Sequence, residues 1–191
     1  MRVWIMRHGE SETNRSGVWT GQVDAALTEK GRAQAVAARK NLADVSFDRI
    51  YSSDLSRARV TTETVMPDRA YECSELLREM DVGTLAGRSF SKMAAEEREI
   101  LVREGFGAFG GESMDDFVTR VREFMKKLES EGGENIAVFT HAGWMRRFFT
   151  LALGMEYPFG KIVCGNCATA IFEYKYGEWR LHSWINSDQI T

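Results

Sequence analysis

Cysteine and proline are scarce in this chain of 191 residues, which contains three cysteines and two prolines. Three cysteines cannot build a disulfide framework, so the composition favours a reducing compartment and we expect a cytoplasmic protein. With so few prolines and no low-complexity tract, no stretch of the sequence looks like a linker between domains. We therefore expect one domain over residues 1–191, which is long enough to bury a sizeable core.

Long hydrophobic runs and an excess of positive charge are also missing. No apolar run approaches the length of a membrane span, and Arg7 and His8 interrupt the N-terminal apolar run too early for a signal peptide. The net charge is −3, whereas a nucleic-acid-binding surface needs a basic excess. We therefore expect no membrane and no nucleic-acid partner, and the composition leaves a homo-oligomer open.

Short apolar runs indicate the strands of a central sheet. The runs are almost continuously apolar, which is typical of strands buried on both faces. A turn at Tyr176-Gly177 separates two further strand-like stretches and predicts a final hairpin. The expected strands cover residues 1–6, 47–52, 70–73, 135–140, 167–174 and 179–184.

Helical patterns alternate with these strands. Thr28 is a plausible N-cap for a helix over 28–42, and Ser113 begins a capping-box pattern for a helix over 114–131. Apolar residues recur in the latter at steps of three and four, which predicts an amphipathic helix. They are Met114, Phe117, Val121, Phe124 and Leu128. Together with helices up to residue 65 and over 144–153, the alternation predicts a three-layer α/β/α sandwich with a mostly parallel central sheet.

Residues 75–112 interrupt this alternation. They hold six glycines, several aromatic residues and a charged helical stretch near 89–103. A long excursion of this kind is usually functional in a compact domain. We expect a lid or specificity segment here.

Charged and imidazole side chains follow three of the predicted strands. Arg7 and His8 come after the first, His141 after the strand over 135–140, and Arg57 one turn after the strand that ends at Ser52. Ligands of open α/β sheets bind outside the carboxyl ends of the strands, so these groups can converge. A phosphoryl group fits such a cluster, because guanidinium groups match its oxygens.

The order of the motifs resembles that of the histidine phosphatase superfamily, the fold group that includes cofactor-dependent phosphoglycerate mutase. The resemblance covers residues 1 to about 153 and is strongest to the branch of α-ribazole phosphatase and broad-specificity phosphatases. The motifs are Arg7-His8-Gly9-Glu10, Asn14, Thr20-Gly21-Gln22-Val23-Asp24, Leu27-Thr28-Glu29-Lys30-Gly31, Ser52-Ser53-Asp54-Leu55-Ser56-Arg57-Ala58, Leu77-Arg78-Glu79, Gly111-Glu112-Ser113 and Thr140-His141-Ala142-Gly143.

The resemblance implies a metal-independent phosphomonoester hydrolase without a cofactor, acting on a small-molecule phosphate ester. His8 is then the nucleophile that forms a phosphohistidine, and Glu79 is the proton donor. Arg7, Arg57 and His141 hold the transferring phosphoryl group. The remaining residues of the expected phosphate pocket are Asn14, Thr20, Gly21 and Ala142.

Neighbouring residues compete for two of these roles. Arg59 lies on the same expected helix start as Arg57, but the motif spacing favours Arg57. Glu75 and Asp81 flank Glu79, and the Leu-x-Glu pattern favours Glu79. Glu112 either lines the mouth of the pocket or only begins the next helix, and the sequence leaves both open.

The remaining chemically active side chains lie outside these motifs. Cys164 and Cys167 have redox-type spacing, but they precede a predicted strand, whereas a thioredoxin-like motif opens a helix. We therefore interpret them as incidental thiols and His182 as structural.

Two other functions stay open. Trp19-Thr20-Gly21 is similar to a stretch of phosphoglycerate mutase, but Met80-Asp81-Val82-Gly83 departs from the mutase pattern after its acid. A regulatory phosphoprotein phosphatase or phosphate-binding module is the third alternative. Acidic and basic residues are balanced in the expected lid at 84–112, so its charge does not require a second anionic group on the substrate. Aromatic residues that could contact a leaving group are Trp19, Phe90, Phe106, Phe109 and Trp144.

Overall fold

A six-stranded sheet forms the centre of the computed structural model, which describes residues 1–156 and 161–186. The strand order is β3-β2-β4-β1-β5-β6. The first four strands run parallel, and β5 and β6 form the predicted antiparallel hairpin at one edge. The strands are β1 (Arg2–Arg7), β2 (Arg49–Ser52), β3 (Glu72–Cys73), β4 (Asn135–Thr140), β5 (Thr169–Lys175) and β6 (Glu178–Ile185).

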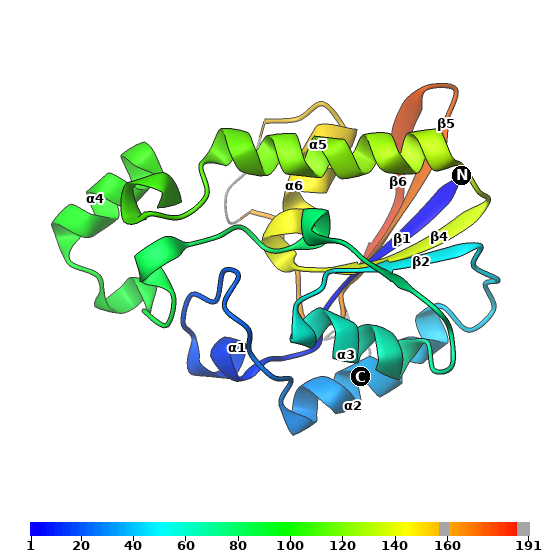
Figure 1. The fold of residues 1–191 in the computed structure, drawn as a ribbon, viewed down its shortest axis with the longest axis horizontal. Coiled ribbons are helices and arrows are strands. Elements are labelled where there is room, and N and C mark those ends of the chain that lie inside the picture. Colours follow the sequence, from blue (N-terminus) through cyan, green and yellow to red (C-terminus); the bar gives the residue numbers. More distant parts are fainter. Residues whose placement is uncertain (157–160, 187–191) are drawn as a thin grey trace.

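Helices cover both faces of the sheet, which confirms the predicted α/β/α sandwich. Figure 1 shows α5 and α6 on one face and α2 and α3 on the other, while α4 lies well away from the sheet. The helices are α1 (Glu12–Ser16), α2 (Glu29–Ala38), α3 (Ser56–Val65), α4 (Ala95–Glu104), α5 (Met114–Glu131) and α6 (Ala142–Ala152). No helix of the described residues is long and apolar enough to cross a membrane.

The central strands bury side chains on both faces, as their continuous apolar character predicts. In β1, Val3 and Ile5 pack into the core beneath α5 and α6, whereas Trp4 and Met6 pack into the core beneath α2 and α3. Strand β4 divides its side chains in the same way. Because successive side chains of a strand point to opposite faces of the sheet, β1 and β4 each contribute to both hydrophobic cores.

The helix starts follow the predicted caps. The hydroxyl of Thr28 accepts from the Gly31 amide, and that of Ser113 accepts from the Asp116 amide. Two details of the prediction are wrong. The helix expected over 28–42 ends at Ala38 and continues as a short 3-10 turn, and Met114 is 43% exposed because the first residue of α5 lies beyond the core.

The excursion over residues 75–112 contains α4 and several short 3-10 turns and adds no strand to the sheet. Its own small core consists of Val82, Leu85 and Met93, against which Trp19 and Phe106 pack. This separate packing lets the segment stand at the carboxyl end of the strands, where it walls a cavity.

The turn after β1 is pressed against the start of α2. A Cβ atom on Gly9 would lie 2.3 Å from the Gly31 carbonyl oxygen, and one on Gly31 would lie 2.1 Å from the Glu10 carbonyl oxygen. The hydroxyl of Thr61 on α3 accepts from the Gly9 amide at 3.0 Å. Two glycines distant in sequence thus hold the turn that carries His8 in one position.

Replacing Gly31 by alanine tests this close approach. On helix propensity alone, G31A would stabilise α2, but the added methyl group meets backbone that cannot move aside. We expect G31A to lower the free energy of unfolding by about 1–3 kcal/mol in urea denaturation. G107A is the matched control, since its Cβ would meet nothing closer than 4.0 Å. A G31A protein as stable as G107A would contradict the proposed contact.

Candidate active site

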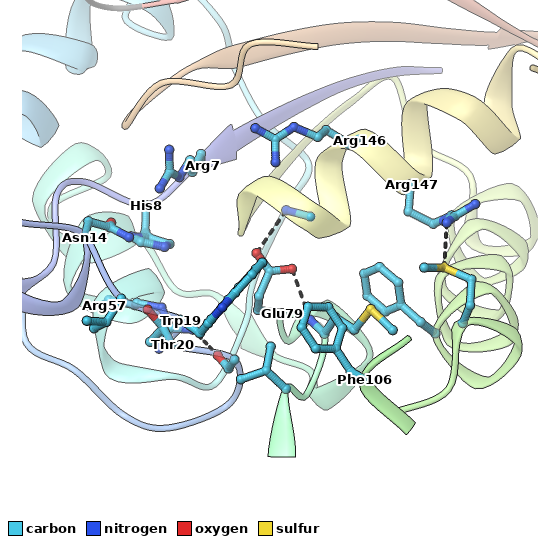
Figure 2. A pocket seen from close by; sticks show the side chains of 17 residues that line it. Arg7, His8, Asn14, Trp19, Thr20, Arg57, Glu79, Phe106, Arg146 and Arg147 are labelled. Atoms are coloured by element: carbon cyan, nitrogen blue, oxygen red, sulfur yellow. Dashed lines mark hydrogen bonds between the residues drawn. The ribbon is translucent and has the colours of Figure 1, made fainter. Parts of the chain in front are cut away.

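A cavity of about 250 Å³ opens at the carboxyl ends of the parallel strands (Figure 2). Two of the nine predicted site residues, His141 and Ala142, are not among those that line it. The other seven line the cavity: Arg7, His8, Asn14, Thr20, Gly21, Arg57 and Glu79. Segments from the first third of the chain, the excursion and α6 therefore meet at one place.

Parallel pairing of β1 with β4 brings the two strand-end histidines together. Arg7 is the register partner of Thr140, and the His8 amide donates to the Thr140 carbonyl at 3.0 Å. Each histidine is the next residue after its strand, and their ring centroids lie 5.1 Å apart. The strand register thus determines that His8 and His141 are neighbours.

His8 is held as a neutral imidazole with a defined tautomer. Its Nδ1 lies 2.6 Å from the Gly9 carbonyl oxygen, which can only accept, so Nδ1 carries the proton and Nε2 keeps its lone pair. Burial lowers the pKa of His8 well below its usual value, and the charges of Arg57 and Arg7 lower it further. A neutral imidazole with a lone pair in a cavity is a competent nucleophile.

His141 lies behind the cavity wall and is completely buried. Its Nε2 is 2.9 Å from the hydroxyl of Ser53, the residue that follows β2. Burial lowers its pKa well below the usual value, with further contributions from Arg57 and His8. Within the described residues its Nδ1 has no hydrogen-bond partner.

Arg7 and Arg57 are held by backbone carbonyl groups. Arg7 Nη1 donates to the Cys164 carbonyl at 2.6 Å. Arg57 is 1% exposed and donates to the carbonyls of Gly21 at 2.7 Å and Val23 at 2.9 Å. Burial lowers the pKa of Arg57 to about 10, yet it stays charged at neutral pH. Neither arginine forms an ion pair with any described residue. An anionic ligand would therefore offset the free-energy cost of removing their charges from water.

Asn14 and Thr20 complete this part of the wall through neighbouring polar groups. Asn14 Oδ1 accepts from the Ser11 amide at 3.2 Å and from Asn166 Nδ2 at 3.1 Å. Thr20 Oγ1 donates to Thr13 Oγ1 at 2.7 Å. These contacts tie Thr20 to α1, and α1 to the segment that precedes β5.

Glu79 is the one carboxylate among the lining residues in the described part of the chain. Its Oε2 accepts from the Gly143 amide at 2.9 Å and its Oε1 from the Met80 amide at 3.0 Å. A Cβ on Gly143 would lie 2.3 Å from Glu79 Oε1, so only glycine permits this approach. Of the competing acids, Glu75 is 76% exposed and pairs with Arg78, and Asp81 accepts from the Gly83 amide.

Glu112 does not line the cavity but forms an ion pair with Arg120 of α5. Arg120 Nε and Nη2 donate to its two carboxylate oxygens at 2.9 and 2.8 Å. Arg120 also donates to the carbonyls of Arg78 at 2.8 Å and Glu79 at 3.3 Å. The pair therefore supports the backbone that carries Glu79. Arg120 was not predicted from the sequence.

Helix α6 contributes three lining residues that were not predicted as site residues: Gly143, Arg146 and Arg147. A sequence signal for them exists, since they lie within the first two turns of a helix that begins directly after His141.

Aromatic and aliphatic side chains form another part of the wall. Trp19 and Phe106 line the cavity with their ring centroids 5.2 Å apart. Of the other aromatic candidates, Trp144 is completely buried in the core and Phe90 is 48% exposed. The excursion thus contributes Phe106, Val82 and Met80 to the cavity.

Cys164 and Cys167 precede β5, as predicted, and do not open a helix. Burial raises the pKa of the Cys164 thiol to about 11, so it is not a thiolate at neutral pH. No group of three or more His, Cys, Asp or Glu side chains in residues 1–156 and 161–186 could hold a metal ion.

Comparison with known proteins found a matching family model and several similar chains and structures. The family model of the histidine phosphatase superfamily, branch 1, matches residues 3–187. An adenosylcobalamin/α-ribazole phosphatase from Salmonella typhimurium is 32% identical over 75% of this chain and 75% of its own length. A protein from Salmonella choleraesuis named a probable phosphoglycerate mutase is 28% identical over 97% of this chain and 90% of its own. A phosphoserine phosphatase mutant from Entamoeba histolytica shares the fold, with a TM-score of 0.88, 23% identity and coverage of 100% and 99%.

The ionisation of His8 can be measured directly. With 15N-labelled histidine, we expect NMR to report His8 as a neutral imidazole protonated on Nδ1 at pH 6, because the arginine charges and burial lower its pKa. Inorganic phosphate should raise that pKa, since an anion offsets the arginines. H182Q removes one of the three histidine signals and assists assignment. A cationic His8 at pH 6, or one protonated on Nε2 alone, would contradict the arrangement.

Proposed function

The chain belongs to the histidine phosphatase superfamily, and from this premise we propose that it is a phosphomonoester hydrolase acting through a covalent phosphohistidine on His8. The observation that carries the proposal is the neutral His8, whose Nδ1 is engaged by Gly9 while Nε2 remains available beside the half-buried Arg7 and the buried Arg57. The similarity to an α-ribazole phosphatase supports hydrolysis. A cavity of about 250 Å³ suits a small phosphate ester.

In the first step, His8 Nε2 attacks the phosphorus atom and the bond from phosphorus to the ester oxygen breaks. The leaving oxygen takes a proton from the carboxylic acid of Glu79. The phosphoryl group is then bonded to Nε2. Arg7 and Arg57 stabilise the negative charge spread over its oxygens, while the Gly9 carbonyl stabilises the proton on Nδ1.

In the second step, water attacks the phosphohistidine. Glu79, now a carboxylate, accepts a proton from that water, and His8 leaves with its lone pair restored. Inorganic phosphate is the product. The amides of Gly143 and Met80 hold the Glu79 carboxyl group in place in both steps.

The arginines supply the charge neutralisation that a divalent ion supplies in other phosphoryl-transfer enzymes. His141 acts from behind the wall. Its neutral ring adds no positive charge beside His8, and its contact with Ser53 holds the end of β2 next to it. We therefore propose that neither a metal ion nor an organic cofactor takes part.

A phosphoglycerate mutase is the second candidate function. The similarity to a protein named a probable phosphoglycerate mutase favours it, as does the resemblance of Trp19-Thr20-Gly21. Both activities share the phosphohistidine and differ in whether water or a second hydroxyl receives the phosphoryl group. Interconversion of 2- and 3-phosphoglycerate faster than phosphate release would establish the mutase and replace the hydrolase.

Removing the nucleophile tests the proposed intermediate. We expect H8A to lower kcat for p-nitrophenyl phosphate by about 1,000-fold or more in excess chelator, with thermal unfolding close to wild type. Wild-type enzyme quenched during turnover of a 32P-labelled ester should carry a label that acid releases. R122Q, at an exposed position of α5, is the control. Substantial turnover by H8A would overturn the assignment.

Comparing two leaving groups tests Glu79 as the proton donor. We expect E79Q to lower kcat/KM for glycerol 3-phosphate about 100-fold more than for p-nitrophenyl phosphate, whose phenolate departs without a proton. E75Q changes a neighbouring carboxylate that is 76% exposed and should leave both values within twofold. Equal losses for the two esters in E79Q would argue against proton donation.

A further inference from the structure

Helix α6 contributes two arginines to the cavity in addition to those beside His8. Arg146 and Arg147 both line it, and Figure 2 shows the Arg146 guanidinium between α6 and the end of β1. Arg146 Nε donates to the Ile162 carbonyl at 2.9 Å, which leaves its two terminal nitrogen atoms for a ligand. Within the described part of the chain, Arg146 has no ion-pair partner.

Within the described part of the chain, the lining of the cavity has more cationic than anionic side chains. Arg7, Arg57 and Arg146 line it together with a single carboxylate, that of Glu79. A phosphoryl group bound at His8 accounts for Arg7 and Arg57. Burial lowers the pKa of Arg7, and the nearby positive charge of Arg146 also lowers it, so the two guanidinium groups repel each other. An anionic group of the ligand beside Arg146 would offset this repulsion, whereas a neutral group would not.

We propose that Arg146 binds a carboxylate on the leaving group, so that the preferred substrates are small phosphorylated carboxylic acids. The inference rests on the proposed hydrolase function and narrows its substrate class. A guanidinium with two unengaged terminal nitrogens matches the two oxygens of a planar carboxylate. The partner of the Arg146 fork is therefore a carboxylate rather than a neutral hydroxyl group.

The position of Arg146 suits this role. The leaving oxygen must lie beside Glu79, and Glu79 is hydrogen-bonded to Gly143, which lies one turn before Arg147 on the same helix. A substituent two or three bonds beyond the leaving oxygen is then within reach of the next turn of α6. Trp19 and Phe106 form the apolar part of the cavity wall, and α6 with Arg146 forms the part of the wall that can bind an anion.

The excursion does not supply this charge. Arg78, Arg88, Arg98 and Arg103 of the excursion are not among the described lining residues, and three of them form ion pairs: Arg78 with Asp54, Arg88 with Glu97 and Arg103 with Glu104. Besides Glu79, the excursion contributes the apolar side chains of Met80, Val82 and Phe106 to the wall. Recognition of the second anionic group therefore comes from the same helix whose first turn binds the proton donor.

A matched pair of esters tests the inference. 3-Phosphoglycerate and glycerol 3-phosphate share a carbon skeleton and differ in having a carboxylate or a hydroxymethyl group at one end. We expect wild-type enzyme to show the higher kcat/KM for 3-phosphoglycerate. In R146Q, this preference should fall by about 10- to 100-fold, which corresponds to the loss of a charge-assisted pair of hydrogen bonds.

Two further variants separate recognition from packing. R146K keeps the positive charge without the two parallel donors of a guanidinium group and should retain part of the preference. R122Q changes an exposed position of α5 and should retain all of it. Thermal unfolding of R146Q reports any structural effect of losing the Ile162 contact. D-Lactate should inhibit wild-type turnover of glycerol 3-phosphate more strongly than that of R146Q.

The outcomes distinguish the inference from the function on which it rests. Turnover of both esters without preference, or equal losses for both in R146Q, would overturn carboxylate recognition and leave the hydrolase standing. Failure of wild-type enzyme to release phosphate from either ester or from p-nitrophenyl phosphate would overturn the hydrolase and the inference together. A larger loss for 3-phosphoglycerate than for glycerol 3-phosphate in R146Q supports the inference.

Discussion

The parallel pairing of β1 with β4 is the constraint on which the rest of the site depends. It makes Arg7 the register partner of Thr140, so the residues that follow the two strands, His8 and His141, are neighbours. A slip of one residue would turn the strand side chains toward the wrong faces and disrupt both cores. Hydrophobic packing on the two faces of the sheet therefore also positions the polar groups at its edge.

The electrostatic character of the cavity follows from this placement. Arg57 is almost completely buried, lines the cavity and donates to the backbone carbonyls of Gly21 and Val23. Burying cations without carboxylate partners costs stability, but it keeps His8 neutral and prepares the site for an anion. Within the described lining, Glu79 is the single carboxylate. The Gly143 amide donates to its side chain, and Arg120 donates to its backbone carbonyl.

Much of the fold and the centre of the site could be predicted from the sequence. Continuous apolar runs identified β1 and β4, and Thr28 and Ser113 marked helix starts, because these are local patterns. Arg57 was preferred over Arg59 by motif spacing, and the structure places Arg57 in the cavity wall and leaves Arg59 exposed. Contacts between residues far apart in sequence were not accessible in this way, and the hydrogen bonds from Arg120 to the carbonyls of Arg78 and Glu79 are the clearest example.

The sequence by itself determined the chemistry at the strand ends, because the order of strands and the residues that follow them are properties of the chain. The tertiary structure alone decided which side chains share the cavity. It moved His141 behind the wall, joined Glu112 to Arg120 and brought Arg146 beside Arg7. The physical reason is that these positions depend on how helices α5 and α6 pack over the sheet and on the direction of each side chain, which periodicity along the chain does not encode.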